Sequence, residues 1–163
     1  MSAAATGADG LLVRSYGTGD RDPIVALLVG SEPWIRLGYD TRTWESILSL
    51  PLRGRESHVM ERGGKPVGIA LVKPRFLAGD YLEVLAVRED ERGRGIGGRL
   101  LDHVEETAFD RGRNLFVCVS DFNPRARAFY ARHGYVEIGP IPDLLVRGSA
   151  EILMRKTTGP ARG

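Results

Sequence analysis

Cysteine is almost absent from this sequence, which carries one thiol, Cys118, in 163 residues. A single cysteine cannot form an internal disulfide, and its place in an apolar run predicts a buried strand residue in a protein of the reducing cytoplasm. Long apolar runs are missing too, because no segment approaches the roughly 20 residues that a membrane-spanning helix needs. The sequence therefore predicts a soluble, cytoplasmic protein with no membrane partner.

A large excess of charge of one sign is also missing. Lys and Arg number 23 against 21 Asp and Glu, so the formal net charge is only +2. Such a small charge gives no electrostatic reason to expect bulk binding of nucleic acid. The histidines, His58, His103 and His133, are scattered singly and lack the spacing of metal ligands. We therefore predict neither a nucleic-acid partner nor a bound metal.

The length of the chain fits one domain, since a domain of this size buries roughly two thirds of the surface that its unfolded chain exposes. No internal repeat and no linker divides the sequence. We expect a flexible start over residues 1–10, one folded domain over residues 11–157 and a flexible end over residues 158–163.

Apolar periodicity and turn residues predict mixed strands and helices. The expected strands cover residues 11–15, 58–62, 67–73, 81–87, 115–119, 135–138 and 151–154. The expected helices run from Pro23 after a cap at Asp22, after a cap at Thr41 or Thr43 through Leu48, from Ile96 to about Gly112, and from Pro124 after a cap at Asn123 to about Gly134. This order predicts an α/β fold whose sheet has mixed strand directions and is flanked by helices.

The most informative segment is the glycine-rich turn between the strand that ends at Val87 and the helix that begins near Ile96. Glycines leave backbone N–H groups uncovered and permit the positive φ values of a tight loop, while the start of a helix directs its positive dipole end at the same place. The glycines of this turn are Gly93, Gly95, Gly97 and Gly98. The segment therefore predicts a site for a phosphorylated ligand.

Two other interpretations of this loop have to be considered. Gly93, Gly95 and Gly98 satisfy the dinucleotide pattern G-x-G-x-x-G. However, five charged residues, 88–92, separate the strand from the first glycine, and the chain supplies too few βα units for a Rossmann sheet. The glycines could also serve only close packing of strand and helix, but packing needs one glycine rather than four. Phosphate binding is the favoured interpretation.

Two motifs occur in order along the chain. Residues 92–97 have the form R-x-x-G-x-G, and residues 123–130 have the form N-x-x-A-x-x-F-Y, followed by Gly-Tyr at 134–135. Together they resemble the motifs of the GNAT superfamily of N-acetyltransferases, with clear similarity over roughly residues 67–156. The resemblance implies a mostly antiparallel, twisted sheet of six to seven strands flanked by about four helices. It also implies acetyl-CoA as cosubstrate and direct transfer of the acetyl group to an amine in a ternary complex.

The resemblance also implies which residues hold the cofactor. In the family, the strand before the loop and the next strand splay apart, the backbone between them binds pantetheine, and the loop N–H groups bind the pyrophosphate. The matching positions here are Leu85, Ala86, Val87, Arg92, Gly93, Arg94, Gly95, Ile96, Gly97, Gly98, Arg99, Asn123 and Tyr130.

Two of these positions have a structural as well as a functional interpretation. Tyr130 matches the family tyrosine that protonates the leaving thiolate, a role that a phenol fills without being ionised. The alternative is a core aromatic that packs beside Ala126 and Phe129. Asn123 would both cap its helix and reach the pantetheine, although the cap alone would explain it.

The general base is the least defined residue of the predicted site. Glu83 shares a strand face with the residues that line the cofactor, so we expect it to contact the amine directly or through a water. Asp80 and Asp121 stand at strand ends and are rivals, although both are also ordinary turn residues. Cys118 as a covalent acetyl carrier would lack a nearby histidine.

The acceptor amine is not identified by the sequence. Trp34, Tyr39 and Trp44 could line an acceptor pocket, but packing against the early helices is favoured. Two other functions remain open: an acetyl-CoA-binding sensor module without catalysis, and a nucleotide-dependent oxidoreductase. A homodimer is compatible with the sequence, but no residue requires one.

Overall fold

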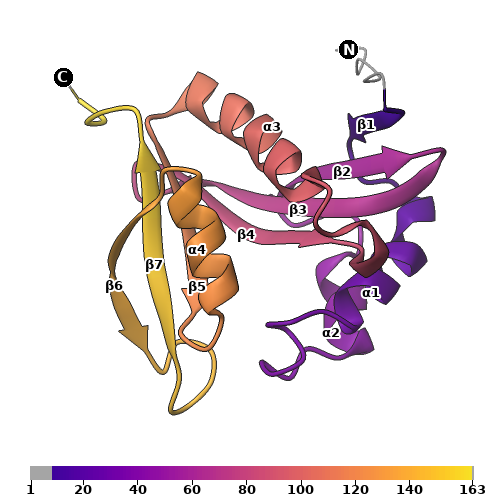
Figure 1. Ribbon diagram of the computed structural model, residues 1–163, viewed down its shortest axis with the longest axis horizontal. Helices are drawn as coiled ribbons and strands as arrows, with labels where there is room; N and C mark the ends of the chain where they lie inside the picture. Colours follow the sequence, from indigo (N-terminus) through magenta and orange to yellow (C-terminus); the bar gives the residue numbers. More distant parts are fainter. Residues whose placement is uncertain (1–8, 163) are drawn as a thin grey trace. The chain divides into compact units, whose positions relative to one another are not determined.

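The structure is a computed structural model that describes residues 9–162. The predicted flexible start therefore lies almost entirely outside the described residues. In the described part of the chain, seven strands form one sheet in the order β1-β2-β3-β4-β5-β7-β6, accompanied by four α-helices (Figure 1). β1 with β2, β2 with β3, β5 with β7 and β6 with β7 pair antiparallel, whereas β4 pairs with β5 in parallel. The predicted α/β class with a mostly antiparallel sheet is confirmed.

Every predicted strand and helix is present, with different ends. The strands are β1 (Leu11–Arg14), β2 (Glu56–Arg62), β3 (Lys65–Phe76), β4 (Gly79–Val87), β5 (Asn114–Ser120), β6 (Val136–Pro142) and β7 (Ala150–Thr157). The α-helices are α1 (Arg21–Val29), α2 (Thr41–Ile47), α3 (Ile96–Arg111) and α4 (Pro124–Arg132), and two short 3-10 helices are η1 (Thr18–Asp20) and η2 (Glu89–Glu91).

The predicted starts of the first two helices are wrong. Asp20 binds the backbone N–H of Gly17 at 2.8 Å, which closes η1 and leads directly into α1 at Arg21, two residues before the expected start. The cap of α2 is Asp40, whose carboxylate accepts the N–H of Thr43 at 2.9 Å. The cap of α2 thus lies one residue before Thr41, whereas α1 continues directly from η1 without a side-chain cap.

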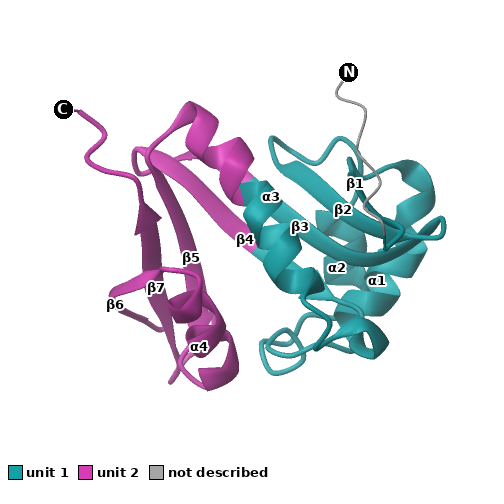
Figure 2. Ribbon diagram, turned by 45° about the horizontal axis from the view of Figure 1, so that its top comes forward, with its two compact units in different colours: residues 1–72, 84–104 teal, residues 73–83, 105–163 magenta. Residues whose placement is uncertain are grey.

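The described chain forms two compact units (Figure 2). The first contains residues up to 72 together with 84–104, and the second contains residues 73–83 and all residues from 105 onward. β3, β4 and α3 each contribute residues to both units.

The core of the first unit lies between α1, α2 and the central strands. Ile24, Leu28 and Trp44 are fully buried there. The rings of Trp34 and Tyr39 lie 5.3 Å and 5.2 Å from the ring of Trp44, measured between centroids. The aromatic residues of the N-terminal half therefore pack against one another and the core, as the favoured interpretation predicted.

In the second unit, β5 lies between β4 and β7 and is buried almost throughout. It pairs with β7 from Asn114 to Ser120, but with β4 only from Asp80–Leu115 to Leu82–Val117. Both faces of this strand are apolar, which is typical of a central strand. At the end of β5, the pairing with β7 therefore continues to Ser120, whereas the pairing with β4 has already ended at Val117.

Gly79 is a position where this packing leaves no room for a side chain. A Cβ built on Gly79 would lie 2.3 Å from the backbone oxygen of Asn114 on β5. We expect Gly79→Ala to lower the free energy of unfolding by about 2–3 kcal/mol, because backbone atoms have to move. Gly112→Ala is the matched control, since its Cβ would meet only ordinary contacts of 3.8 Å and 3.9 Å. Urea unfolding of both variants measures the difference, and equal stabilities would contradict the close approach.

Candidate active site

The glycine-rich loop joins the end of β4 to the start of α3. Gly93 and Gly95 have φ values of +73° and +77°, a region that glycine adopts without strain. A Cβ at either position would meet nothing within 4 Å, so the loop needs these glycines for its backbone conformation and not for close packing. This observation disfavours the packing interpretation of the loop.

The backbone N–H groups of this loop are available to a ligand. Within the part of the chain that the structure describes, those of residues 93–98 donate no hydrogen bond to a turn, a cap or a side chain, and the first such bond of α3 is from Arg99 to the carbonyl of Gly95. Unpaired N–H groups at the start of a helix, together with its dipole, bind anions. The loop therefore has the backbone geometry of a phosphate site.

Arg92 holds the loop in place. Its Nε donates to the carbonyl oxygen of Val87 and its Nη2 to the hydroxyl of Ser31, each at 3.0 Å. The hydroxyl of Ser31 in turn donates to the carbonyl of Leu27 near the end of α1, at 2.6 Å. The guanidinium thus fastens the loop to the strand before it and to a helix 61 residues away in the sequence. A direct contact of Arg92 with the cofactor remains a prediction.

A buried carboxylate organises the arginines around the loop. The side chain of Glu91 is only 9% exposed and lies 3.3 Å, 3.7 Å and 3.6 Å from the guanidinium groups of Arg62, Arg88 and Arg94. Glu91 thus holds three arginines at the turn, and one of them, Arg88, is also paired with Asp90 at 2.6 Å. Arg99 forms an ion pair with Asp9.

The last residues of β4 carry apolar side chains, which suits a strand that binds a ligand through its backbone groups. Val84 and Ala86 are buried in the core of the first unit, and Leu85 and Val87 are half-buried. In the second unit, the ladder between β4 and β5 ends at Leu82–Val117, although β5 continues. An ended ladder is what the predicted splaying of these strands requires.

The second motif forms the start and body of α4. The Asn123 side chain accepts the N–H of Ala126 at 3.1 Å, and Pro124 occupies the first helical position. The predicted cap is therefore present. Its carboxamide oxygen is engaged in the cap, so a contact with pantetheine stays a prediction.

Tyr130 lies among aromatic rings and is only 7% exposed. Its ring centroid is 5.1 Å from that of Phe129 and 5.3 Å from that of Tyr135. Burial raises the pKa of Tyr130 above its ordinary value, so the phenol is protonated at neutral pH. The packed ring matches the core interpretation, and the protonated hydroxyl meets the chemical requirement of a general acid.

The predicted base candidates differ in their partners. Asp80 is buried and accepts hydrogen bonds from Arg111 at 2.7 Å and from the N–H of Arg75 at 3.1 Å. Asp121 accepts from the hydroxyl of Ser149 and the N–H of Ala150, each at 3.0 Å. Both aspartates therefore hold local structure. Glu83 has one oxygen 3.2 Å from the ammonium of Lys73.

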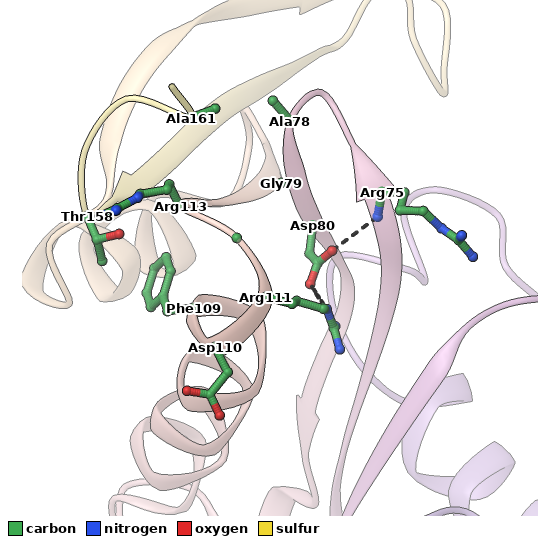
Figure 3. Close-up of a pocket in the computed structure, with 11 residues that line it drawn as sticks. Arg75, Ala78, Gly79, Asp80, Phe109, Asp110, Arg111, Arg113, Thr158 and Ala161 are labelled. Carbon is green, nitrogen blue, oxygen red and sulfur yellow. Dashed lines mark hydrogen bonds and ion pairs between the residues drawn. The ribbon is translucent and has the colours of Figure 1, made fainter. Parts of the chain in front are cut away.

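A hollow of about 790 Å³ opens in the second unit between the turn after β3 and the segment after β7. The ion pair of Asp80 and Arg111 lies in it, and the guanidinium of Arg75 points away from that pair (Figure 3). The lining residues are Arg75, Ala78, Gly79, Asp80, Phe109, Asp110, Arg111, Gly112, Arg113, Thr158 and Ala161. None of them belongs to the predicted cofactor-binding set.

Comparison with known proteins identifies the family. The model of the acetyltransferase (GNAT) family matches residues 22–135. A probable N-acetyltransferase of Mycobacterium tuberculosis is 27% identical over 125 residues, which are 75% of this chain and 67% of that protein. Five curated relatives are covered over 32% to 67% of their own lengths.

Solved structures show the same fold. An aminoglycoside 6'-N-acetyltransferase complexed with coenzyme A has a TM-score of 0.74 at 20% identity, with 93% of this chain and 99% of that chain covered. An acetyltransferase from Thermus thermophilus has a TM-score of 0.72 at 21% identity, with coverage of 90% and 96%. The predicted family is confirmed, and with it the class of acetyl-CoA-dependent acetyltransferase. The dinucleotide interpretation of the loop finds no support in these matches.

Residues 9–162 contain no group of three or more His, Cys, Asp and Glu side chains placed to hold a metal ion. In the same part of the chain, no helix combines the length and apolar character needed to cross a membrane.

Proposed function

Because this chain belongs to the acetyltransferase (GNAT) family, we propose that it transfers the acetyl group of acetyl-CoA directly to a primary amine in a ternary complex. The amine belongs to a small molecule or to a peptide or protein. The observation that carries the proposal is the loop before α3, where Gly93 and Gly95 adopt positive φ and the N–H groups of residues 93–98 are free for a phosphate.

The cofactor is bound mainly by backbone in this proposal. The N–H groups of residues 93–98 bind the pyrophosphate, the positive end of α3 adds to the attraction, and Arg94 and Arg99 supply charge beside it. Backbone groups of residues 85–87 hydrogen-bond the pantetheine amides, as Asn123 does from the start of α4. A backbone N–H of the strand polarises the thioester carbonyl.

Acetyl transfer then needs a neutral amine and a protonated leaving group. Tyr130 supplies the proton to the departing thiolate, a role supported by its match to the second motif and by a pKa that burial raises. Glu83 is the base that the sequence favours. One of its carboxylate oxygens lies 3.2 Å from the ammonium group of Lys73.

Direct transfer is favoured over an acetylated cysteine. Burial raises the pKa of Cys118, and the charge of Glu151 adds to the effect, so the residue is a thiol at neutral pH and a poor nucleophile. We expect the intact mass of the protein to stay unchanged after incubation with acetyl-CoA alone, and initial-rate lines for acetyl-CoA and amine to intersect. An acetyl group on Cys118 with parallel lines would contradict direct transfer.

The substrate and the class are tested together by following thiol release with a panel of amines, peptides and aminoglycosides. Turnover with one class of amine identifies the acceptor. Acetyl-CoA binding without turnover on any of them would favour the sensor module instead.

The proposal places the catalytic domain at residues 11–157 and the protein in the cytoplasm, where Cys118 would remain reduced. A homodimer stays an expectation that no described contact requires.

A further inference from the structure

A polar cluster at the end of β5 in the second unit has no part in the reaction described so far. Its centre is Glu151, the cross-strand partner of Ser120 in the β5–β7 ladder. The hydroxyl of Ser120 donates to Oε1 of Glu151 at 2.7 Å. Glu151 is 5% exposed and Ser120 is 1% exposed. The carboxylate is therefore held in one orientation at a buried position.

Glu151 differs from Asp80 and Glu83 because the described residues supply no cation that neutralises it. The described residues place no Lys, Arg or His in an ion pair with it, and its Oε2 accepts no hydrogen bond from them. Asp80, by contrast, is paired with Arg111, and Glu83 with Lys73. A carboxylate without a cation is the stronger proton acceptor, because the ionised form is less stabilised.

The surroundings of Glu151 also make its carboxylate a stronger proton acceptor. Burial raises the pKa of Glu151, the nearby charge of Asp121 raises it further, and the hydrogen bond from Ser120 opposes both. A carboxylate that titrates closer to neutral pH takes a proton from an ammonium group more readily than an ordinary glutamate does.

The cluster also adjoins the second motif and the opened edge of β5. The N–H of Asn123 donates to the carbonyl of Ser120 at 2.9 Å. Ser120 is therefore hydrogen-bonded both to Glu151 and to the first residue of the second motif. Cys118 lies on the same face of β5 as Ser120, one residue beyond the end of the ladder with β4. Burial and the neighbouring Cys118 raise the pKa of Tyr81, and the charge of Glu151 adds to the effect.

We propose that Glu151 is the general base of the acetyl transfer and that Ser120 positions its carboxylate; the inference rests on the proposed function. Oε2 of Glu151 takes one proton from the ammonium group of the acceptor. The neutral nitrogen then forms a bond to the acetyl carbon as the carbon–sulfur bond breaks and its electron pair goes to sulfur. Tyr130 protonates that sulfur and recovers a proton, through solvent, from the newly bonded nitrogen. Glu151 releases its proton to solvent, so the products are the amide, free CoA and one proton.

The test is the pH dependence of kcat/KM for the amine. The wild-type protein should lose activity as the pH falls through the pKa of Glu151, because only the carboxylate accepts a proton. Glu151→Gln should lower kcat/KM at neutral pH by about 100-fold and remove this acidic limb, while the Kd for acetyl-CoA changes less than about twofold. Glu137→Gln, an exposed glutamate of the same unit, is the control and should keep the wild-type profile.

Ser120→Ala gives a second, independent readout. The hydrogen bond from Ser120 lowers the pKa of Glu151, so its removal should shift the acidic limb to higher pH while activity above the limb largely returns. A merely structural serine would change stability without moving the limb. Thermal unfolding of each variant establishes that it is folded.

The outcomes separate two claims. An acidic limb that persists in Glu151→Gln, or that disappears in Glu83→Gln instead, would overturn the assignment of Glu151 and leave acetyl transfer standing. A wild-type protein that binds acetyl-CoA but acetylates no amine would overturn the proposed function, and the role of Glu151 with it.

Discussion

Replacing Tyr130 with phenylalanine is expected to lower kcat by about 100- to 1000-fold while the Kd for acetyl-CoA changes less than about twofold. The substitution removes one hydroxyl and keeps the ring, so the contacts with Phe129 and Tyr135 remain. What is lost is the proposed proton donor for the leaving thiolate, which is needed only in the transition state. Thiol release under saturating amine, together with calorimetric titration of acetyl-CoA, measures both quantities.

Tyr135→Phe is the matched control for this substitution. Its phenol is also buried, its ring centroid lies 5.3 Å from that of Tyr130, and burial raises its pKa as well. Loss of the Tyr135 hydroxyl should leave kcat within about threefold, since no step is assigned to it. Equal rates for Tyr130→Phe and the wild-type protein would remove the general acid from the mechanism and leave Tyr130 as a core aromatic.

The second large effect is expected from Gly95→Glu, which should raise the Kd for acetyl-CoA by roughly 100-fold or more. Gly95 has a φ of +77° and an open environment, so a side chain there projects into space that the ligand would use. A glutamate adds bulk and brings a negative charge to the loop that we propose binds phosphate through backbone N–H groups. Binding should therefore fail before any step of chemistry.

Gly64→Glu is the control for this substitution. It separates a loss of acetyl-CoA binding at the loop from the effects of backbone strain and added charge alone. Gly64 lies in the β2–β3 turn, has a φ of +79° and is equally open, so the substitution carries a similar conformational cost of about 1 kcal/mol or more. Its affinity for acetyl-CoA should match that of the wild-type protein. Unchanged affinity in Gly95→Glu would place the phosphate elsewhere on the chain.

The fold was predictable where turn residues act locally. Gly63 and Gly64 both adopt positive φ in the two-residue turn between β2 and β3, as their sequence indicated. The prediction ended β3 too early, at Lys73, although the strand continues through Pro74 to Phe76. The ladder with β2 has already ended at Val72, so the missing N–H of Pro74 costs no hydrogen bond on that side.

In the candidate site, too, the features with a local sequence signal could be predicted and the contacts between distant residues could not. The glycine loop could be predicted because its signal lies within a few consecutive residues. The contact of Arg92 with Ser31 could not, since it joins positions 61 apart, and Glu151 was missed because its partner Ser120 lies 31 residues away. The available signal for Glu151 was a single acidic residue at the start of an apolar strand, which by itself also describes an ordinary solvent-facing position.

The most direct measurement of the central claim is a reaction with acetyl-CoA whose acetyl group is deuterated, followed by mass spectrometry of the amine and quantification of free CoA thiol. The account predicts that the label appears on the amine nitrogen in the same molar amount as the released thiol. Thiol release without a labelled amine, or an absence of acetyl-CoA binding, would contradict it.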